Sequence, residues 1–343
     1  MPTSKSRWIR RAGGLVAAVA LAFTATACGG DSETGEGKGG GETVLKLIDP
    51  GNAGVLAYAM KSGILDQELR KVGARVEWGG YYPSFTAATD AIRSGAINVQ
   101  SGAISPALGY LSSTQDIKIF SFGDPVTDQR AGAGDGLVVK PNSSITSVQD
   151  LVGKKVAVNR AGHGEYLLLL ALEQAGVPAD KVERVYMQPD QAAGAFAAGR
   201  IDAWVAIVDA FPEAVAQGAR VIFRGRDLPS DDLSITVASN KVLNENPKAL
   251  QTYLKVVQDL TAEQRLNPEK FQNVFEDKGP RAADGARLTN NIETARYANP
   301  PRLPKPDDTK SIEAVNALFN KYNVLPNKVD PAAVVFDWSK VPS

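Results

Sequence analysis

The chain contains one cysteine, Cys28, and one histidine, His163, so cysteine chemistry and histidine-dependent chemistry each have a single candidate residue. One histidine cannot supply the usual multi-histidine zinc site, and neither a Gly-x-Ser-x-Gly elbow nor a Walker loop occurs. We therefore expect no metal, no cofactor and no enzymatic activity. A hydrolase in which His163 activates a serine is the enzymatic alternative that stays open.

His163 lies in a glycine-rich turn, residues 159–164, that follows a β-rich run and leads into a helical pattern. Gly162 and Gly164 allow the backbone to approach a ligand, and the first N–H groups of a helix attract anions. His163 and Arg160 are candidate donors to such an anion. The competing interpretation is an ordinary strand-to-helix turn with a solvated arginine.

Two further turns have the same character. Residues 50–54 contain Asn52, and residues 101–105 contain Gly102 and Ala103. Each turn follows an expected strand and precedes a helical pattern. Because loops at the carboxyl ends of strands converge on one crevice in open α/β sheets, we expect the three turns to contribute to a common ligand site.

Aromatic residues cluster after the second expected strand, where Trp78, Tyr81, Tyr82 and Phe85 fall within eight residues of a chain that is 7% aromatic. They are suited to form the wall of a site for an organic ligand, and we favour this role for Tyr81 and Tyr82. A hydrophobic contact between helix and sheet is the alternative.

Trp204 and Asp209 are the last two candidates. Trp204 lies in an expected strand, where it contacts either the core or a ligand. Asp209 follows that strand, and it either caps the next helix or, if it faces the cleft, binds an amine.

The N-terminal residues 1–27 have the layout of a secretory signal, with four basic residues followed by an apolar run of nine residues, 15–23. The stretch ATAC that ends at Cys28 resembles a bacterial lipobox, which implies a lipidated cysteine at the outer face of the cytoplasmic membrane. Residues 29–43 contain no large apolar side chain, so we interpret residues 28–43 as the lipidated cysteine and a tether.

Composition narrows the possible partners. Without residues 1–27 the chain has 34 basic and 38 acidic residues, because the leader carries four of the 38 basic ones. This balance gives no support to nucleic-acid binding. With 43% apolar residues and more than about 250 residues, the chain is expected to build two lobes.

From residue 44 onward, short β-rich runs alternate with helical patterns, which predicts α/β sheets with mostly parallel strands. Breaks at residues 131–134 and 228–230 bracket a block of about a hundred residues. We therefore predict a discontinuous first lobe, residues 44–133 plus 232–343, and a second lobe, residues 134–231. The expected strands are residues 44–48, 75–78, 97–100, 117–120, 136–139, 155–158, 182–187, 203–207, 220–223 and 234–238. The expected helices include residues 85–93, 165–175, 191–198, 247–265, 268–277 and 311–322.

Three motifs of the expected second lobe are distinctive: SVQDLVGKKVAV (residues 147–158), GHGEYLL (162–168) and QAAGAFAAGRIDAW (191–204). Together they resemble the second lobe of solute-binding proteins of the sulfonate, nitrate and taurine transporter family, and the first lobe matches more loosely at AIRSGAINV (91–99). The resemblance implies a two-lobed, periplasmic-binding-protein-like fold of type II, in which each lobe is a mixed sheet flanked by helices and the ligand lies between the lobes. The family commonly has a Ser-Ser or Ser-Ala pair where this chain has Gly162 and His163.

The resemblance further implies a lipid-anchored, extracytoplasmic and monomeric receptor of an ABC importer. Such a receptor captures a small organic anion by closure of the lobes and delivers it to a permease with its ATPase. Two alternatives stay open: a cationic, zwitterionic or heterocyclic solute, such as taurine or a thiamine precursor, and a lipid-anchored sensor or co-receptor that uses the same cleft.

Overall fold

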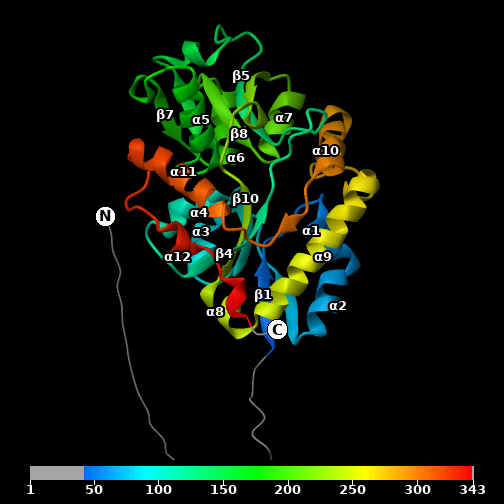
Figure 1. Ribbon diagram of the computed structural model, residues 1–343. Coiled ribbons are helices and arrows are strands. Elements are labelled where there is room, and N and C mark those ends of the chain that lie inside the picture. The colour runs from blue at the N-terminus through cyan, green and yellow to red at the C-terminus, as the bar shows by residue number, and fades with distance from the viewer. Residues whose placement is uncertain (1–41, 342–343) are drawn as a thin grey trace, which may run out of the picture. The chain divides into compact units, whose positions relative to one another are not determined.

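The computed structural model describes residues 42–341 (Figure 1). The expected signal peptide, Cys28 and all but the last two residues of the expected tether lie outside the described residues. No helix between residues 42 and 341 is long and apolar enough to cross a membrane.

Two sheets form the half of the structure that contains residues 42–123 and 234–341. One is the parallel pair β1 and β2, and the other has the order β11-β4-β10-β3 with antiparallel pairing throughout. Leu45 and Leu47 alternate along β1 and belong to the buried cluster that includes residues of α2 and α9. The strands are β1 (Thr43–Leu47), β2 (Ala74–Trp78), β3 (Val99–Ala103), β4 (Ile117–Gly123), β10 (Ser234–Ser239) and β11 (Pro301–Arg302).

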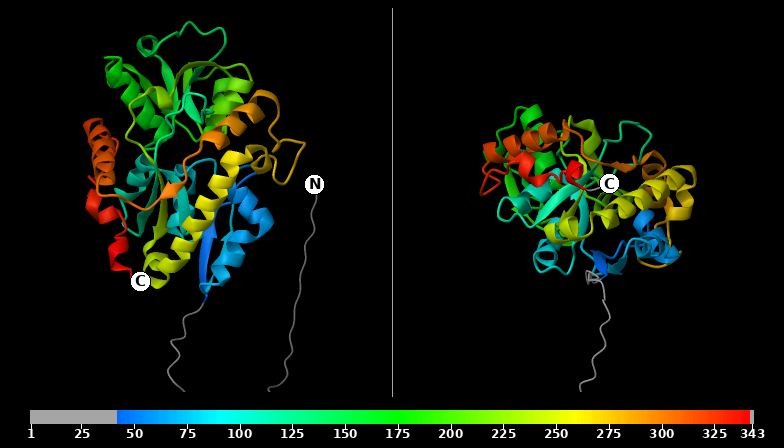
Figure 2. Two further views of the ribbon diagram at one scale, coloured as in Figure 1. Left: turned by 45° about the vertical axis from the view of Figure 1, so that its right-hand side comes forward. Right: turned by 60° about the horizontal axis from the view of Figure 1, so that its bottom comes forward.

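Helices cover these two sheets. The 20-residue helix α9 lies beside α1 and α2 (Figures 1 and 2). It begins at Pro247, and the side chain of Asn246 accepts a hydrogen bond from the N–H of Ala249 at 3.1 Å, which caps the helix. The helices are α1 (Val55–Ser62), α2 (Ile64–Arg70), α3 (Thr89–Arg93), α4 (Ile104–Leu111), α8 (Asn240–Glu245), α9 (Pro247–Leu266), α10 (Gly285–Tyr297), α11 (Asp308–Lys321) and α12 (Pro331–Val334).

The other half is a single sheet with the order β7-β6-β8-β5-β9 and helices on both faces. Successive residues of β8 alternate between the faces, because side chains along a strand point to opposite sides. Ala203 and Val205 pack with α5, whereas Trp204 and Ala206 pack with α6 and α7. The elements are β5 (Asp135–Val139), β6 (Lys155–Val158), α5 (His163–Gln174), β7 (Glu183–Tyr186), α6 (Pro189–Ala197), β8 (Ala203–Ile207), α7 (Ala210–Ala216) and β9 (Arg220–Arg224).

All ten expected strands overlap observed ones, but the expectation of mostly parallel pairing needs correction. Among the described strands three pairs are parallel and five are antiparallel. Four of the antiparallel pairs involve β5 and β10, the first strands after the chain crosses between the halves. Each of these strands enters its new sheet between two strands that run the opposite way. Strand-helix-strand alternation predicts parallel pairing for strands that a helix connects within one half, and it predicts nothing about a strand that follows a crossing between the halves.

The predicted helix over residues 268–277 is also wrong. Only a short 3-10 helix forms, Pro268–Phe271, and the chain then turns at Asn273, whose φ is +48°. The buried Asn52 holds the following segment, because its Oδ1 accepts from the N–H groups of Phe275 at 2.8 Å and Glu276 at 3.0 Å. Backbone groups that bond a distant side chain are not available to continue a helix.

The chain crosses between the halves twice, through residues 124–134 and 225–233. Helix α10 holds the first crossing, because Asn290 accepts from the N–H of Ala133 at 2.9 Å and donates to its carbonyl at 3.0 Å. We keep the lobe boundaries, residues 44–133 plus 232–343 and residues 134–231, as a proposal. Its support is that no sheet among residues 42–341 takes strands from both segments.

On one side the two halves share a hydrophobic cluster built from α4, α5 and α11. Tyr166 of α5 packs edge-on against Phe319 of α11, with 6.1 Å between ring centroids. Nearby, the Tyr322 hydroxyl donates to Glu173 at 3.0 Å, and Lys321 pairs with the same carboxylate. These contacts join the two halves on the side where α4, α5 and α11 meet.

Candidate ligand-binding cleft

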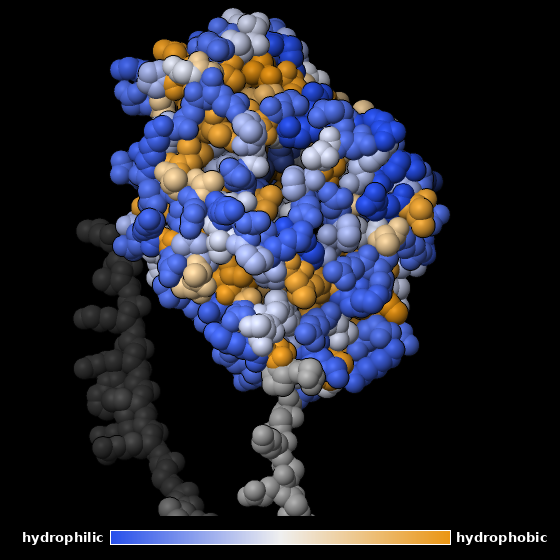
Figure 3. All heavy atoms as spheres, in the orientation of Figure 1, coloured by the Kyte–Doolittle hydropathy of each residue, from blue (hydrophilic) through white to orange (hydrophobic). Residues whose placement is uncertain are grey.

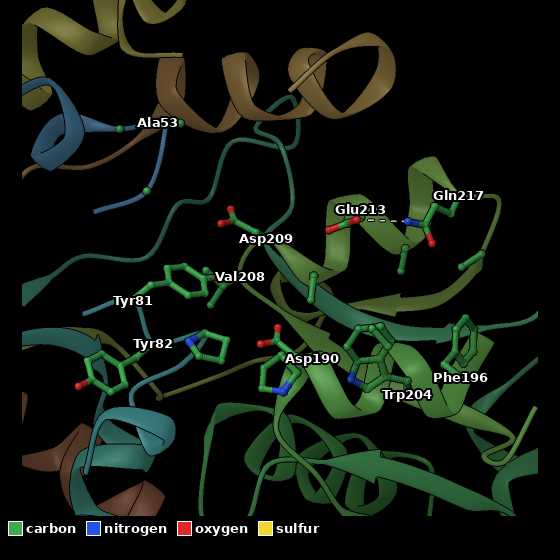
Figure 4. Close-up of a pocket in the computed structure, with 18 of the residues that line it drawn as sticks. Ala53, Tyr81, Tyr82, Asp190, Phe196, Trp204, Val208, Asp209, Glu213 and Gln217 are labelled. Atoms are coloured by element: carbon green, nitrogen blue, oxygen red, sulfur yellow. Dashed lines mark hydrogen bonds between the residues drawn. The ribbon is translucent and has the colours of Figure 1, made fainter. Parts of the chain in front are cut away.

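A cavity of about 810 Å³ lies between the two halves (Figure 4). One half contributes the turn between β1 and α1 and the segment with Tyr81 and Tyr82, and the other contributes α6, α7 and Trp204. A second cavity of about 610 Å³ shares Asp49, Tyr81 and Asp209 with the first, so we treat the two as parts of one cleft. The face seen in Figure 1 is mostly hydrophilic, with apolar patches in the half that carries β5 and β8 (Figure 3).

The local backbone explains how Trp204 and Asp209 reach the cleft. Trp204 lies on the α6 and α7 face of β8, where it packs against Phe196 with 5.9 Å between ring centroids and is 4% exposed. Val208 follows the strand with a φ of +54°, which is a strained conformation for a β-branched residue. Asp209 is the N-cap residue of α7, but its side chain makes no capping hydrogen bond. Its carboxylate is therefore left open to the cleft (Figure 4).

Carboxylates dominate the electrostatics of the larger cavity, which is lined by Asp49, Asp190, Asp209 and Glu213. Partial burial and then the charges of these four groups raise the pKa of Tyr81. Burial among the cleft walls raises the pKa of Asp209, and Arg287 only partly opposes this shift. The cavity is therefore a region of negative potential.

Five of the predicted site residues line the cleft. Tyr81, Tyr82, Trp204 and Asp209 line the larger cavity, and Asn52 lines the smaller one. The side chain of Asn52 is already occupied, because its amide group donates to the carbonyls of Glu276 at 2.7 Å and Arg281 at 3.1 Å. The role of these residues in binding stays a prediction.

The other six predicted residues line neither of these two cavities; they are Gly102, Ala103, Arg160, Gly162, His163 and Gly164. Gly102 instead packs under Phe85, and Arg160 lies over the ring of Tyr186 at 3.8 Å. The turn at residues 159–164 is held from within, because the N–H of Gly164 donates to Asn159 Oδ1 at 3.1 Å. The group that lies close to Gly162 and Gly164 is therefore the side chain of Asn159 and not a ligand.

His163 lies between two carboxylates at the crossings of the chain. Its Nδ1 is 2.7 Å from Asp232 and its Nε2 is 3.2 Å from Asp135. Asp232 also accepts from the backbone N–H of Ser105 at 2.7 Å, so it ties the start of α4 to the start of α5. Burial by itself would lower the pKa of His163, but the hydrogen bonds to Asp135 and Asp232 outweigh it and raise the pKa to about 10.

This arrangement removes the geometric basis of the serine hydrolase alternative. Both ring nitrogens of His163 face carboxylates, so neither is directed at a serine hydroxyl. Ser105 is the serine nearest in the network, and it is buried and donates its hydroxyl to Asp232. His163 therefore has no geometry for activating a nucleophile.

Polar side chains also connect the halves beside the turn at residues 159–164. Gln188 accepts from Ser84 at 3.0 Å and from Thr86 at 3.3 Å. Gln188 precedes α6 in one half, and Ser84 and Thr86 belong to the loop and 3-10 helix that precede α3 in the other. The two halves thus touch directly at this point.

Sequence reasoning missed several residues of the larger cavity. Asp190 opens α6, Glu213 lies in the first turn of α7, and Phe196 lies near the end of α6. The rule that helix starts after strands meet at a cleft, applied to the segment before α6, would have found Asp190. Within residues 42–341 no group of three or more His, Cys, Asp or Glu residues lies close enough to hold a metal ion.

Known proteins resemble this chain in sequence and in fold. A Bacillus subtilis (strain 168) protein named as a candidate aliphatic sulfonates-binding protein is 26% identical over 272 residues, or 77% of each chain. The taurine-binding periplasmic protein of Escherichia coli (strain K12) is 25% identical over 206 residues, 58% of this chain and 61% of its own length.

The alkanesulfonate-binding protein SsuA from Xanthomonas axonopodis pv. citri, solved with bound MOPS, aligns with a TM-score of 0.73 at 20% identity, covering 87% of this chain and 98% of that one. This likeness confirms the predicted two-lobed, periplasmic-binding-protein-like α/β fold. The sequence pattern of the family described as "NMT1/THI5 like" matches residues 87–270, more than half of the 343 residues. The chain therefore belongs to the NMT1/THI5-like family.

Proposed function

We propose that this protein is the solute receptor of an ABC importer and that it encloses one small organic molecule between its two lobes. The observation that carries the proposal is the cavity of about 810 Å³ with lining residues from both halves. Pockets for small organic ligands commonly measure about 300–1,000 Å³ and combine apolar walls with a few polar groups. The partners are then the solute and a permease with its ATPase.

Closure of the lobes is the mechanism of capture. Tyr81 and Tyr82 belong to one half and Trp204 and Asp209 to the other, so a solute that touches both sets stabilises the closed arrangement. The contacts of Gln188 with Ser84 and Thr86 then act as a latch between the lobes.

The identity of the solute is the open part of the proposal. The names of the relatives mention sulfonates and taurine. Three helices, α1, α6 and α7, start at the larger cavity, and the N–H groups of helix starts favour a small organic anion of this kind. The same cavity presents four carboxylates, which favours the alternative of a solute that carries an amine or a heterocycle.

We also propose an extracytoplasmic protein anchored by lipid at Cys28, with residues 1–27 removed as a signal peptide. Support comes from the basic and apolar pattern of the leader and the ATAC sequence that ends at Cys28. A radiolabelled fatty acid supplied to cells should label the wild-type protein and not a Cys28→Ser protein, because the variant has no thiol to acylate. Equal labelling of the two proteins, or no labelling of the wild type, would contradict the anchor.

A binding screen tests the solute receptor directly. Thermal unfolding of the purified protein is followed with alkanesulfonates, taurine, nitrate, aromatic carboxylates and pyrimidines. A ligand at one hundred times its Kd stabilises the folded state by about 2.7 kcal/mol. Tyr81→Ala should reduce this gain, whereas Phe275→Ala, which removes an exposed aromatic residue outside both cavities, should not.

Import and sensing are separated by a second measurement. In vesicles that contain the permease and ATPase of the proposed importer, the protein with its solute should stimulate ATP hydrolysis. If the protein binds a solute but changes neither ATP hydrolysis nor uptake, the sensor or co-receptor interpretation replaces import.

A further inference from the structure

We propose that the cleft selects a solute that carries a protonated nitrogen beside a flat or apolar body. This inference rests on the solute-binding function proposed above and specifies its ligand class.

The first argument is the charge of the larger cavity. Its lining contains four carboxylates, and its single basic residue is Lys140. The ammonium group of Lys140 is already engaged, because it donates to the carbonyl of Ala197 at 2.8 Å and lies 5.3 Å from the centre of the Phe196 ring. An anion in this cavity would therefore meet several like charges and one cation that already has partners.

The second argument is which carboxylates are free. Glu213 accepts from Gln217 at 3.2 Å, and Asp49 accepts from the N–H of Gly51 at 2.9 Å. By contrast, the side chains of Asp190 and Asp209 have no hydrogen bond or ion pair with any residue between 42 and 341. Two carboxylates that face a cavity without partners are acceptors for a charged donor on the ligand.

Basic residues in the adjoining, smaller cavity do not cancel this charge. Arg281 lies 3.5 Å from Asp49 and so compensates a carboxylate that already has a partner. Arg287 donates to the carbonyl of Ala282. Burial raises the pKa of Asp209 by more than Arg287 lowers it, so the environment of Asp209 still lacks a sufficient positive charge.

The third argument is independent of charge and comes from Trp204. This side chain is 4% exposed and lines the larger cavity, and its indole N–H has no hydrogen-bond partner among residues 42–341. Figure 4 shows the indole beside Phe196 at the cavity wall. This donor finds its acceptor in the cavity, either a water molecule or an acceptor atom that the solute carries beside its protonated nitrogen, such as a neutral ring nitrogen.

The aromatic walls match the body of such a solute. Trp204 and Phe196 lie on one side of the cavity and Tyr81 on the other, where it is 57% exposed (Figure 4). A flat body fits between these rings, and the faces of aromatic rings also attract cations.

A matched panel of ligands tests the inference. Benzamidine, benzyl alcohol and benzenesulfonate share one ring and differ in the charge of the head group, and taurine and ethanesulfonate differ by one amine. Binding to the purified protein is measured by calorimetry and by tryptophan fluorescence. Benzamidine should bind with a Kd of about 1 mM or tighter, at least about tenfold tighter than the other two ring compounds, and taurine should bind tighter than ethanesulfonate.

Two variants and one control assign the effect to the cleft. Asp209→Asn and Asp190→Asn should each weaken benzamidine binding roughly tenfold or more, because each removes one charge-assisted contact. Asp180→Asn removes the same charge from an exposed position outside both cavities and should change nothing. Unfolding curves of all three proteins show whether folding is intact.

The inference is overturned if benzamidine does not bind at that strength, or if Asp209→Asn and Asp190→Asn leave benzamidine binding unchanged. It is also overturned if benzenesulfonate binds tighter than benzamidine or ethanesulfonate binds tighter than taurine. Binding of an anion in the cleft would leave the proposed solute receptor in place and refute only the ligand class. Failure of every compound in the wider screen, together with no effect on ATP hydrolysis, would refute the receptor itself.

Discussion

Asn159 shows how one buried side chain sets the shape of a turn. Its Oδ1 accepts from the N–H of Gly164 at 3.1 Å, and its amide group occupies the space beside Gly162 where a Cβ would be. Glycine at 162 is therefore required by a steric contact, since its φ of −109° is open to any residue. The sequence predicts that Gly162 lets a ligand approach the backbone closely. A glycine indicates that some group lies close to the backbone, but it does not indicate whether that group belongs to a ligand or to the protein.

Gly162→Ala should destabilise the protein. The new Cβ would lie 1.8 Å from Asn159 Nδ2, so the amide must rotate and give up its bond to Gly164. We expect a loss of about 1–3 kcal/mol in urea unfolding. Gly194→Ala is the control, because a Cβ at this position of α6 would have no neighbouring atom within 4 Å, and alanine there should gain up to about 1 kcal/mol. Equal stability of the two variants would contradict the steric account.

His163 predicts a pH dependence of stability. Its pKa is raised to about 10 in the folded protein, from 6.5, so its contribution is complete below pH 6.5 and is lost as the pH rises toward 10. Burial alone would raise the pKa of Asp135, but the hydrogen bond with His163 outweighs burial and lowers it, so its contribution is lost as the pH falls below 3.8. The cluster should stabilise the fold most between about pH 4 and 6.5.

The test compares wild type with His163→Gln in urea between about pH 6 and pH 9.5. Wild type should lose up to about 1.4 kcal/mol per pH unit above pH 6.5, and the variant should lack this slope. At about pH 6 the variant should be less stable by about 3 kcal/mol, because Asp232 stays buried with one partner fewer. Parallel pH profiles for the two proteins would show that His163 is not charged in the folded state.

At the scale of elements, the C-terminal segment completes the sheet that contains β4. The N–H of Phe336 donates to the carbonyl of Ile119 at 2.8 Å, and the indole of Trp338 donates to the carbonyl of Phe120 at 2.9 Å. The rings of Phe336 and Trp338 pack edge-on, with 4.9 Å between centroids. A segment with little regular secondary structure thereby protects one stretch of the strand edge.

Trp338→Ala should therefore lower the free energy of unfolding by about 2 kcal/mol, less than for a fully buried tryptophan because this one is half-buried. Trp338→Phe should recover most of the loss, since it keeps the ring and gives up only the hydrogen bond. Lys340→Ala, at an exposed position of the same segment, should be neutral within about 0.5 kcal/mol. A neutral Trp338→Ala would show that the segment does not contribute to the folded state.

At the scale of the whole molecule, contacts between the halves differ from one side to the other. The side formed by α4, α5 and α11 is apolar and closely packed, for example at Gly109, where a Cβ would lie 2.9 Å from Ala161. The side with the cleft is held by polar contacts such as those of Gln188. Opening should therefore rotate the halves about the packed side, because small polar contacts separate at lower cost than an apolar interface.

Hydrogen exchange should show this asymmetry. Addition of a bound solute should slow exchange in the segment around Tyr81 and in α7, on opposite walls of the cleft, and should change α5 and α11 little. The measurement uses a ligand from the screen at saturating concentration. Equal protection of α11 and α7 would indicate that the packed side moves as well.

The sequence by itself determined the α/β class, ten of the eleven strands among residues 42–341 and the family, because strand periodicity and local motifs depend on neighbours in the chain. Tertiary structure decided the pairing of β5 and β10, which depends on where the chain enters each sheet. It also decided the site: His163, chosen for its chemistry, pairs with Asp135 and Asp232, while Asp190 and Glu213 line the cavity. The sequence does not show which polar side chains are available to a ligand, because this depends on which side chains form hydrogen bonds and ion pairs with each other in the folded protein.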